Sequence, residues 1–166
     1  MADTIYKQTR KRHDLTREDV CDKASELNKP LQPERLERIE NGKFDITPDE
    51  VMLLAEIYGE PTLCNYYCSK ECPIGEKYVP EIKVKDLSQI VLEMLSSLNS
   101  MKKSQERLIE ISADGVIDDE EINDFVFIQK ELERISITVE TLQLWVEQML
   151  SDGKINIEKY NQIKNN

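Results

Sequence analysis

Four cysteines are the residues whose spacing most directly suggests chemistry in this sequence. Cys64, Cys68 and Cys72 follow one another at intervals of four residues, which places them in one stripe if the segment is helical. Thiolates at positions i and i+4 can share a metal ion, and Pro73 provides a helix break that would let Cys72 turn back. With Cys21 as a fourth sulfur ligand, the set is compatible with zinc or an iron–sulfur cluster. The alternative is that these are small buried thiols that brace a connecting helix.

A second segment with chemical potential is PERLERIENGKF, residues 33–44. Leu36 and Ile39 lie three residues apart and therefore share one helical face. Asn41 and Gly42 then end the helix, because both residue types tolerate the left-handed conformation of helix C-termini. The charged residues on its other faces are Arg35, Glu37 and Arg38. The segment predicts a short amphipathic helix with a polar outer face, suited to contacts with the major groove of DNA.

Composition limits the possible classes of protein. The chain has 166 residues and a net charge of -11, with 33% charged residues, five glycines and six prolines. These totals favour a helical, soluble protein of one medium domain or two small ones. No run of 18 apolar residues is present, so we expect no membrane span, and the N-terminus lacks the apolar core of a secretory signal. We therefore expect a cytoplasmic protein whose cysteines are thiols or metal ligands rather than disulfides.

Catalysis is not expected. The sequence has no glycine-rich phosphate loop, no Gly-x-Ser-x-Gly elbow and no paired histidine and acid. We therefore predict that the protein is not an enzyme and carries no cofactor, apart from the zinc or iron–sulfur alternative at the cysteines.

The elements that must position these residues are short helices in the N-terminal third. Thr16 with Asp19 three residues later is a variant of the capping box, which predicts a helix start. Thr47 and Glu50 repeat the pattern before an apolar run that Gly59 ends. The basic residues Lys7, Arg10, Lys11, Arg12 and Arg17 concentrate positive charge on the first two of these helices.

From residue 86 onward two long helices are predicted, because apolar residues recur at intervals of three and four. The first row is Leu87, Val91, Met94, Leu98, Met101 and Leu108, and the second is Phe125, Ile128, Leu132, Ile135, Val139, Leu142, Val146 and Met149. An Asp-Gly pair follows each helix, and Asn156 is placed to cap a short terminal helix. Two helices cannot bury all of their apolar residues, so a second copy of the chain or the N-terminal domain must cover the remainder. We expect residues 86–166 to form an antiparallel hairpin that dimerises.

The order of LTREDV (15–20), RLERIENGK (35–43) and LLAEIY (53–58) resembles the Cro/phage-repressor-like (XRE) family of helix-turn-helix proteins. The stretch CNYYCSKECPIG (64–75) is similar to one found in some clostridial members of that family. The resemblance implies an all-α protein in which residues 1–60 form a lambda-repressor-like five-helix DNA-binding domain. Residues 61–85 would then be a cysteine-rich connector to the long helical hairpin.

The resemblance also implies roles for individual side chains. The residues expected to face base edges or nearby phosphates are Gln32, Glu34, Arg35 and Arg38. Arg17 and Lys43 match positions that contact phosphate. Arg10 belongs to the same basic group, and the family pattern also pairs it internally with Glu40.

These observations favour a sequence-specific regulator of transcription, most simply a repressor, that binds double-stranded DNA as a homodimer. Two alternatives remain open. One is an adaptor whose helical bundle binds another protein, and the other is a metal- or redox-responsive sensor that uses the cysteine cluster.

Overall fold

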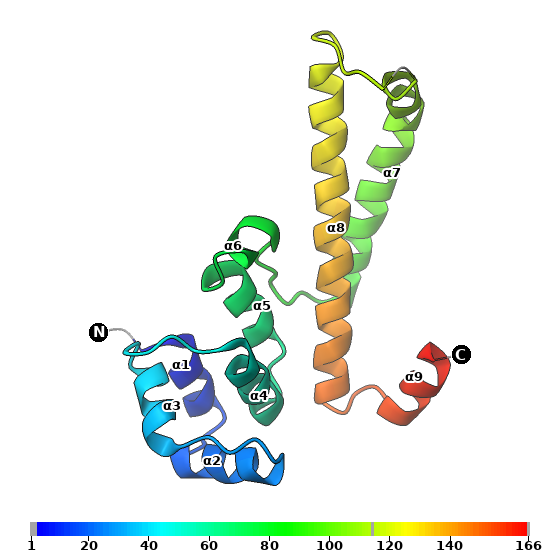
Figure 1. The fold of residues 1–166 in the computed structure, drawn as a ribbon. Helices are drawn as coiled ribbons and strands as arrows, with labels where there is room; N and C mark the ends of the chain where they lie inside the picture. The colour runs from blue at the N-terminus through cyan, green and yellow to red at the C-terminus, as the bar shows by residue number, and fades with distance from the viewer. Residues whose placement is uncertain (1–2, 114, 166) are drawn as a thin grey trace. The chain divides into compact units, whose positions relative to one another are not determined.

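The computed structural model describes residues 3–113 and 115–165, which form helices and loops without a strand. In chain order the helices are α1 (Ile5–Arg12), α2 (Arg17–Glu26), α3 (Pro33–Glu40), α4 (Pro48–Tyr58), α5 (Thr62–Lys70), α6 (Gly75–Tyr78), α7 (Leu87–Ile111), α8 (Ile122–Ser151) and α9 (Ile157–Lys164) (Figure 1). The predicted all-α class is confirmed. No helix within the described ranges is long and apolar enough to cross a membrane.

The helix boundaries follow local signals in the sequence. Thr16 and Asp19 form a complete capping box at the start of α2, and Thr47 and Glu50 form another at the start of α4. Gly59 ends α4 in the left-handed conformation, with φ +64°. The predicted caps at these three helix ends are therefore confirmed.

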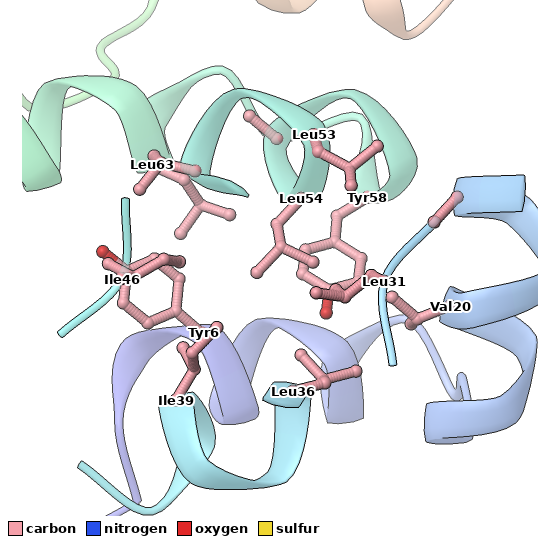
Figure 2. Close-up of a cluster of buried hydrophobic side chains, with 13 residues drawn as sticks. Tyr6, Val20, Leu31, Leu36, Ile39, Ile46, Leu53, Leu54, Tyr58 and Leu63 are labelled. Atoms are coloured by element: carbon pink, nitrogen blue, oxygen red, sulfur yellow. The ribbon is translucent and has the colours of Figure 1, made fainter. Parts of the chain in front are cut away.

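The described residues divide into two compact units, one from residues 1–81 and 146–166 and the other from residues 82–145. The first unit has a hydrophobic core between α1, α2, α3, α4 and α5 (Figure 2). Tyr6 of α1 lies between Ile39 of α3 and Ile46 of the following loop, and Leu54 of α4 fills the centre. The short N-terminal helices thus pack on one another through their apolar faces.

The fifth helix of this core does not lie within residues 1–60. That range holds α1 to α4, and α5 begins at Thr62 in the segment expected to be a connector. Its Leu63 is fully buried in the same core, and α5 packs closely on α4. The segment folds with the N-terminal helices because Leu63 adds an apolar side chain that would otherwise face water.

The last turns of α8 belong to the first unit and contact the end of α4. The Gln148 side chain donates a hydrogen bond of 3.1 Å to the carbonyl oxygen of Gly59. Ser151 also lies against Gly59, since a Cβ atom added to that glycine would be 2.9 Å from the Ser151 hydroxyl oxygen. The left-handed backbone at Gly59 therefore serves both to end α4 and to accept α8.

In the second unit, α7 runs beside the part of α8 that ends at Trp145, and the two form the expected hairpin (Figure 1). The seam, which is the buried face between α7 and α8, differs from the predicted apolar rows. At alternate positions of these rows, the buried residue is the one immediately before the predicted residue. The buried residues are Ser97, Glu131 and Thr138, whereas their exposed neighbours are Leu98, Leu132 and Val139. The predicted placement of Leu98, Leu132 and Val139 in the seam is therefore wrong.

The shift has a physical reason in helix geometry and side-chain size. Consecutive residues are about 100° apart around a helix, so two adjacent positions can both flank a seam. On the α7 side of this seam, Ser100 hydrogen-bonds to the buried Glu131 carboxylate, and the buried Ser97 lies near Thr138. The Ser100 hydroxyl, and after it the Arg134 guanidinium, lowers the pKa of Glu131. Polar side chains of α7 therefore face polar side chains of α8 in this part of the seam.

Candidate nucleic-acid interface

Helix α3 presents a polar surface on a firmly packed apolar base. Leu36 and Ile39 point into the core and are buried (Figure 2). Gln32 precedes the helix as its N-cap, but its side chain makes no capping hydrogen bond and is exposed. Glu34 and Arg38 are exposed as well. Three of the four residues expected to face bases therefore project to solvent from the short helix.

A buried carboxylate ties α3 to the two preceding helices. Glu40 is fully buried, and both of its oxygens accept hydrogen bonds from Arg10 of α1. The Arg17 side chain of α2 donates a further hydrogen bond of 2.9 Å to Glu40. Burial alone would raise the pKa of Glu40, but Arg10 and Arg17 together hold it below its ordinary value. The ion pair expected between Arg10 and Glu40 is present, and Arg17 joins it.

Arg35 has internal partners instead of a free guanidinium. Its Nε and Nη2 atoms donate to the two carboxylate oxygens of Glu50, at 2.7 and 2.8 Å. Nη2 also donates to the backbone carbonyl of Asp45 at 2.9 Å. Glu50 accepts the Thr47 backbone amide in the α4 capping box, so Arg35 links α3 to the start of α4. The resemblance places Arg35 toward bases or phosphates, whereas here its hydrogen bonds brace the loop between two helices.

Phe44, in the loop after α3, contacts two basic side chains of that helix. The guanidinium carbons of Arg35 and Arg38 lie 5.6 and 5.4 Å from the centre of its ring. Such cation–π contacts hold a guanidinium in place without neutralising it. Arg38 and Lys43 are exposed, and neither forms an ion pair with a described residue. They are the basic groups of this surface with the greatest freedom to meet an anion.

The basic residues of α1 are mostly paired with acids of the same unit. Lys7 and Lys11 both contact the Asp3 carboxylate at 2.8 Å, and the two lysines lower the pKa of Asp3 to about 2. Arg12 lies 3.7 Å from Glu60. Exposed pairs of this kind are weak, so phosphate groups could compete for these lysines.

The four cysteines do not form one ligand set. Cys21 is buried on α2, whereas Cys64 and Cys68 lie on α5 and Cys72 follows that helix. Across residues 3–113 and 115–165, no group of three or more His, Cys, Asp or Glu side chains is arranged to hold a metal ion. Cys72 instead accepts a hydrogen bond of 3.5 Å from the Gly75 amide. Only Cys21 is buried, whereas Cys64, Cys68 and Cys72 are half-buried.

Two residues of the interface, Phe44 and Glu50, were not among the expected site residues. Phe44 lies just after the Asn41–Gly42 helix stop, and its aromatic side chain is exposed rather than part of the hydrophobic core. An aromatic residue in a polar loop is the sequence signal that could have identified it. Glu50 was assigned only to its capping box, and its second role with Arg35 depends on how α3 and α4 pack. Sequence spacing alone does not reveal such a contact.

Comparisons of this chain with protein-family models, with curated proteins and with solved structures find no match.

Proposed function

We propose that this protein is a sequence-specific DNA-binding regulator of transcription, acting as a repressor, in which α2 and α3 form a lambda-repressor-like helix-turn-helix. The observation that carries the proposal is the bracing of α3. Glu40 joins it to α1 and α2 through Arg10 and Arg17, while its polar residues remain outside. A reading helix must be held rigidly because base contacts depend on placement.

The exposed side chains suit distinct features of DNA. Arg38 is assigned to a guanine, whose two major-groove acceptors match a guanidinium. Gln32 matches adenine, and Glu34 can accept a hydrogen bond from the cytosine amino group. Lys43 is assigned to phosphate. Arg17 contributes less, because its guanidinium is already paired with the carboxylates of Glu37 and Glu40.

The net charge of -11 restricts the electrostatic part of binding. Charges farther apart than about 8 Å are largely screened at physiological ionic strength, so the local arrangement around α3 matters more than the total. With about three phosphate contacts, the logarithm of affinity would fall by roughly 0.9 per contact for each tenfold rise in salt. Base contacts must then supply much of the specificity.

The hairpin supports the proposal that the regulator is a homodimer. The large apolar residues exposed on the second unit include Leu87, Val91, Leu92, Leu95, Leu98, Phe127, Leu132 and Val139. Monomeric proteins rarely expose so extensive an apolar surface to water. A second hairpin packed on this surface would make a four-helix bundle, and dimers of this class place their reading helices about 34 Å apart, one turn of DNA.

A selection of bound fragments from random double-stranded DNA at low salt tests the function. The expected result is an enriched sequence with two half-sites about one helical turn apart. In Arg38→Ala the base preference should be relaxed at one position of each half-site. Lys103→Ala is the control, since Lys103 is an exposed cation of α7 for which no ion pair with a described residue is found. An absence of enriched sequence for the unaltered protein would contradict the proposal.

The exposed apolar surface also favours a second candidate, an adaptor that binds another protein through its hairpin. This candidate predicts no sequence preference for DNA and does not require a dimer. Light scattering together with the DNA selection distinguishes the two functions, because the regulator must be dimeric and the adaptor need not be.

A further inference from the structure

A cavity of about 520 Å³ lies in the first unit, beside the C-terminal end of α3. Its walls include the aromatic residues Tyr6, Phe44 and Tyr67, together with Ile39 from the last turn of α3. Cavities of this size hold small organic molecules, and aromatic walls with a few polar groups are typical of ligand sites. Neither the proposed base contacts nor the hairpin surface uses this cavity.

The polar groups of the cavity are acidic. Asp45 and Glu71 line it, and neither carboxylate forms an ion pair with a Lys or Arg of the described residues. One oxygen of Glu71 accepts a hydrogen bond of 2.7 Å from the Tyr6 hydroxyl, which fixes the carboxylate in position. Burial raises the pKa of Tyr67, and Cys72, Glu71 and Asp45 add to that effect. The cavity therefore places two carboxylates beside aromatic surfaces, and the Arg35 and Arg38 guanidiniums lie against the Phe44 part of its wall.

We propose that this cavity binds a small organic cation with an aromatic body, of the arylalkylammonium class. The ammonium group would be attracted to the carboxylates of Glu71 and Asp45, and the face of Tyr67 would add a cation–π contact. Phe44, whose ring already contacts Arg35 and Arg38, would add an apolar contact to the aromatic body of the ligand. An anion of the same shape would be repelled by the two acids. A neutral molecule would lack the charge interaction.

The position of the cavity connects the ligand with α3. Phe44 is at once a wall of the cavity and the ring beneath Arg35 and Arg38. Asp45 lines the cavity, and its backbone carbonyl accepts a hydrogen bond from Arg35. A ligand that displaces Phe44 would therefore change how Arg38 is held, so the cation would regulate DNA binding. This regulatory part rests on the proposed function, whereas binding of the cation does not.

Calorimetric titration of the full chain tests the site with three probes of one shape: phenethylamine, 2-phenylethanol and phenylacetate. We expect saturable binding of phenethylamine and at least roughly threefold weaker binding of the other two, since each exposed charge contact contributes a few-fold in affinity. Glu71→Gln keeps an acceptor for Tyr6, and Asp45→Asn keeps the carbonyl for Arg35. Each should weaken phenethylamine binding roughly threefold.

Glu76→Gln is the matched control, because Glu76 is exposed nearby but does not line the cavity. It should leave the affinity unchanged. Equal binding of all three probes, equal loss in Glu76→Gln, or no saturable heat with phenethylamine would each overturn the site.

The regulatory part has a separate readout. Phenethylamine should change the affinity of the protein for its selected DNA at least twofold, and Phe44→Leu should abolish the change. Charge-selective calorimetric binding with unaltered DNA affinity would overturn the regulation alone. If no DNA is selected at all, the proposed function fails, while the titration still decides the cation site.

Discussion

Glu40 at the end of α3 and Arg10 on α1, 30 residues apart in sequence, form a two-pronged ion pair around a fully buried carboxylate. Since Arg17 of α2 shares the same carboxylate, one acidic side chain holds three helices in register. Removal of the Glu40 charge takes from Arg10 and Arg17 a shared, fully buried partner. This relationship leads to the first two predictions.

Glu40→Gln should destabilise the first unit by about 2–3 kcal/mol, because removal of one partner from a buried ion pair leaves the others uncompensated. The measurement is chemical denaturation followed by circular dichroism. Glu37→Gln is the control, since Glu37 meets Arg17 at 3.5 Å with a side chain that is 54% exposed. It should cost less than about 0.5 kcal/mol. Equal losses in the two variants would disprove the bracing role.

The stability provided by Glu40 should depend on pH in the acid range. Its pKa is lowered in the folded protein from an ordinary value of 4.5, so the unfolded chain takes up the proton first as pH falls. The contribution is therefore complete above about pH 4.5 and declines as pH falls towards the folded pKa. The difference in melting temperature between the unaltered protein and Glu40→Gln should accordingly shrink between neutral pH and pH 3. A constant difference would contradict this account.

Arg35 and Arg38 are neighbours on α3, yet substitution should separate their roles. Arg38→Ala should weaken binding to the selected DNA by about 1–3 kcal/mol and relax base preference at one position, with stability little changed. Arg35→Ala should instead lower the free energy of unfolding by about 1 kcal/mol through loss of its Glu50 contacts. Paired denaturation and DNA titrations measure both effects. Reversal of the two patterns would refute the assignment.

If the protein forms the proposed dimer, Leu132→Asp combined with Val139→Asp should convert it into a folded monomer. Both side chains are exposed in the hairpin, 47% and 41%, so charges there do not disturb the seam. Light scattering gives the molar mass, and circular dichroism verifies that the helices persist. Ile157→Asp is the control, since Ile157 is an exposed apolar residue of α9 and should leave the dimer intact. A monomeric unaltered protein would be inconsistent with this use of the hairpin.

Gly75→Ala should destabilise the segment after α5 by about 1–3 kcal/mol, because a Cβ atom there would overlap the backbone carbonyl of Cys68. Gly115→Ala offers a comparison without a steric clash, since no atom lies within 4 Å of the added carbon. Its left-handed φ of +74° should still cost about 1 kcal/mol. Denaturation of both variants measures the difference, and a smaller loss at Gly75 would show that the segment relaxes.

Local signals were sufficient to predict much of the secondary structure. Thr16, Thr47 and Asn156 cap their helices as expected, and Gly59 stops α4. A capping residue acts within three or four positions of itself, so the necessary information lies in the adjacent sequence. The long helices α7 and α8 were predictable for a similar reason, because an apolar period of three and four persists over many turns.

The sequence by itself determined which segments are helical and which residues are apolar, but only the tertiary structure decided their partners. The apolar pattern placed Leu132 and Val139 in the seam, whereas Glu131 and Thr138 occupy it because α7 offers serines at the facing positions. The sequence predicts Arg35 as a DNA contact, whereas in the structure its Nε donates a hydrogen bond of 2.7 Å to Glu50 of α4. Periodicity is a property of one helix, while burial and charge pairing depend on the distance between side chains of different helices, which the order of residues does not specify.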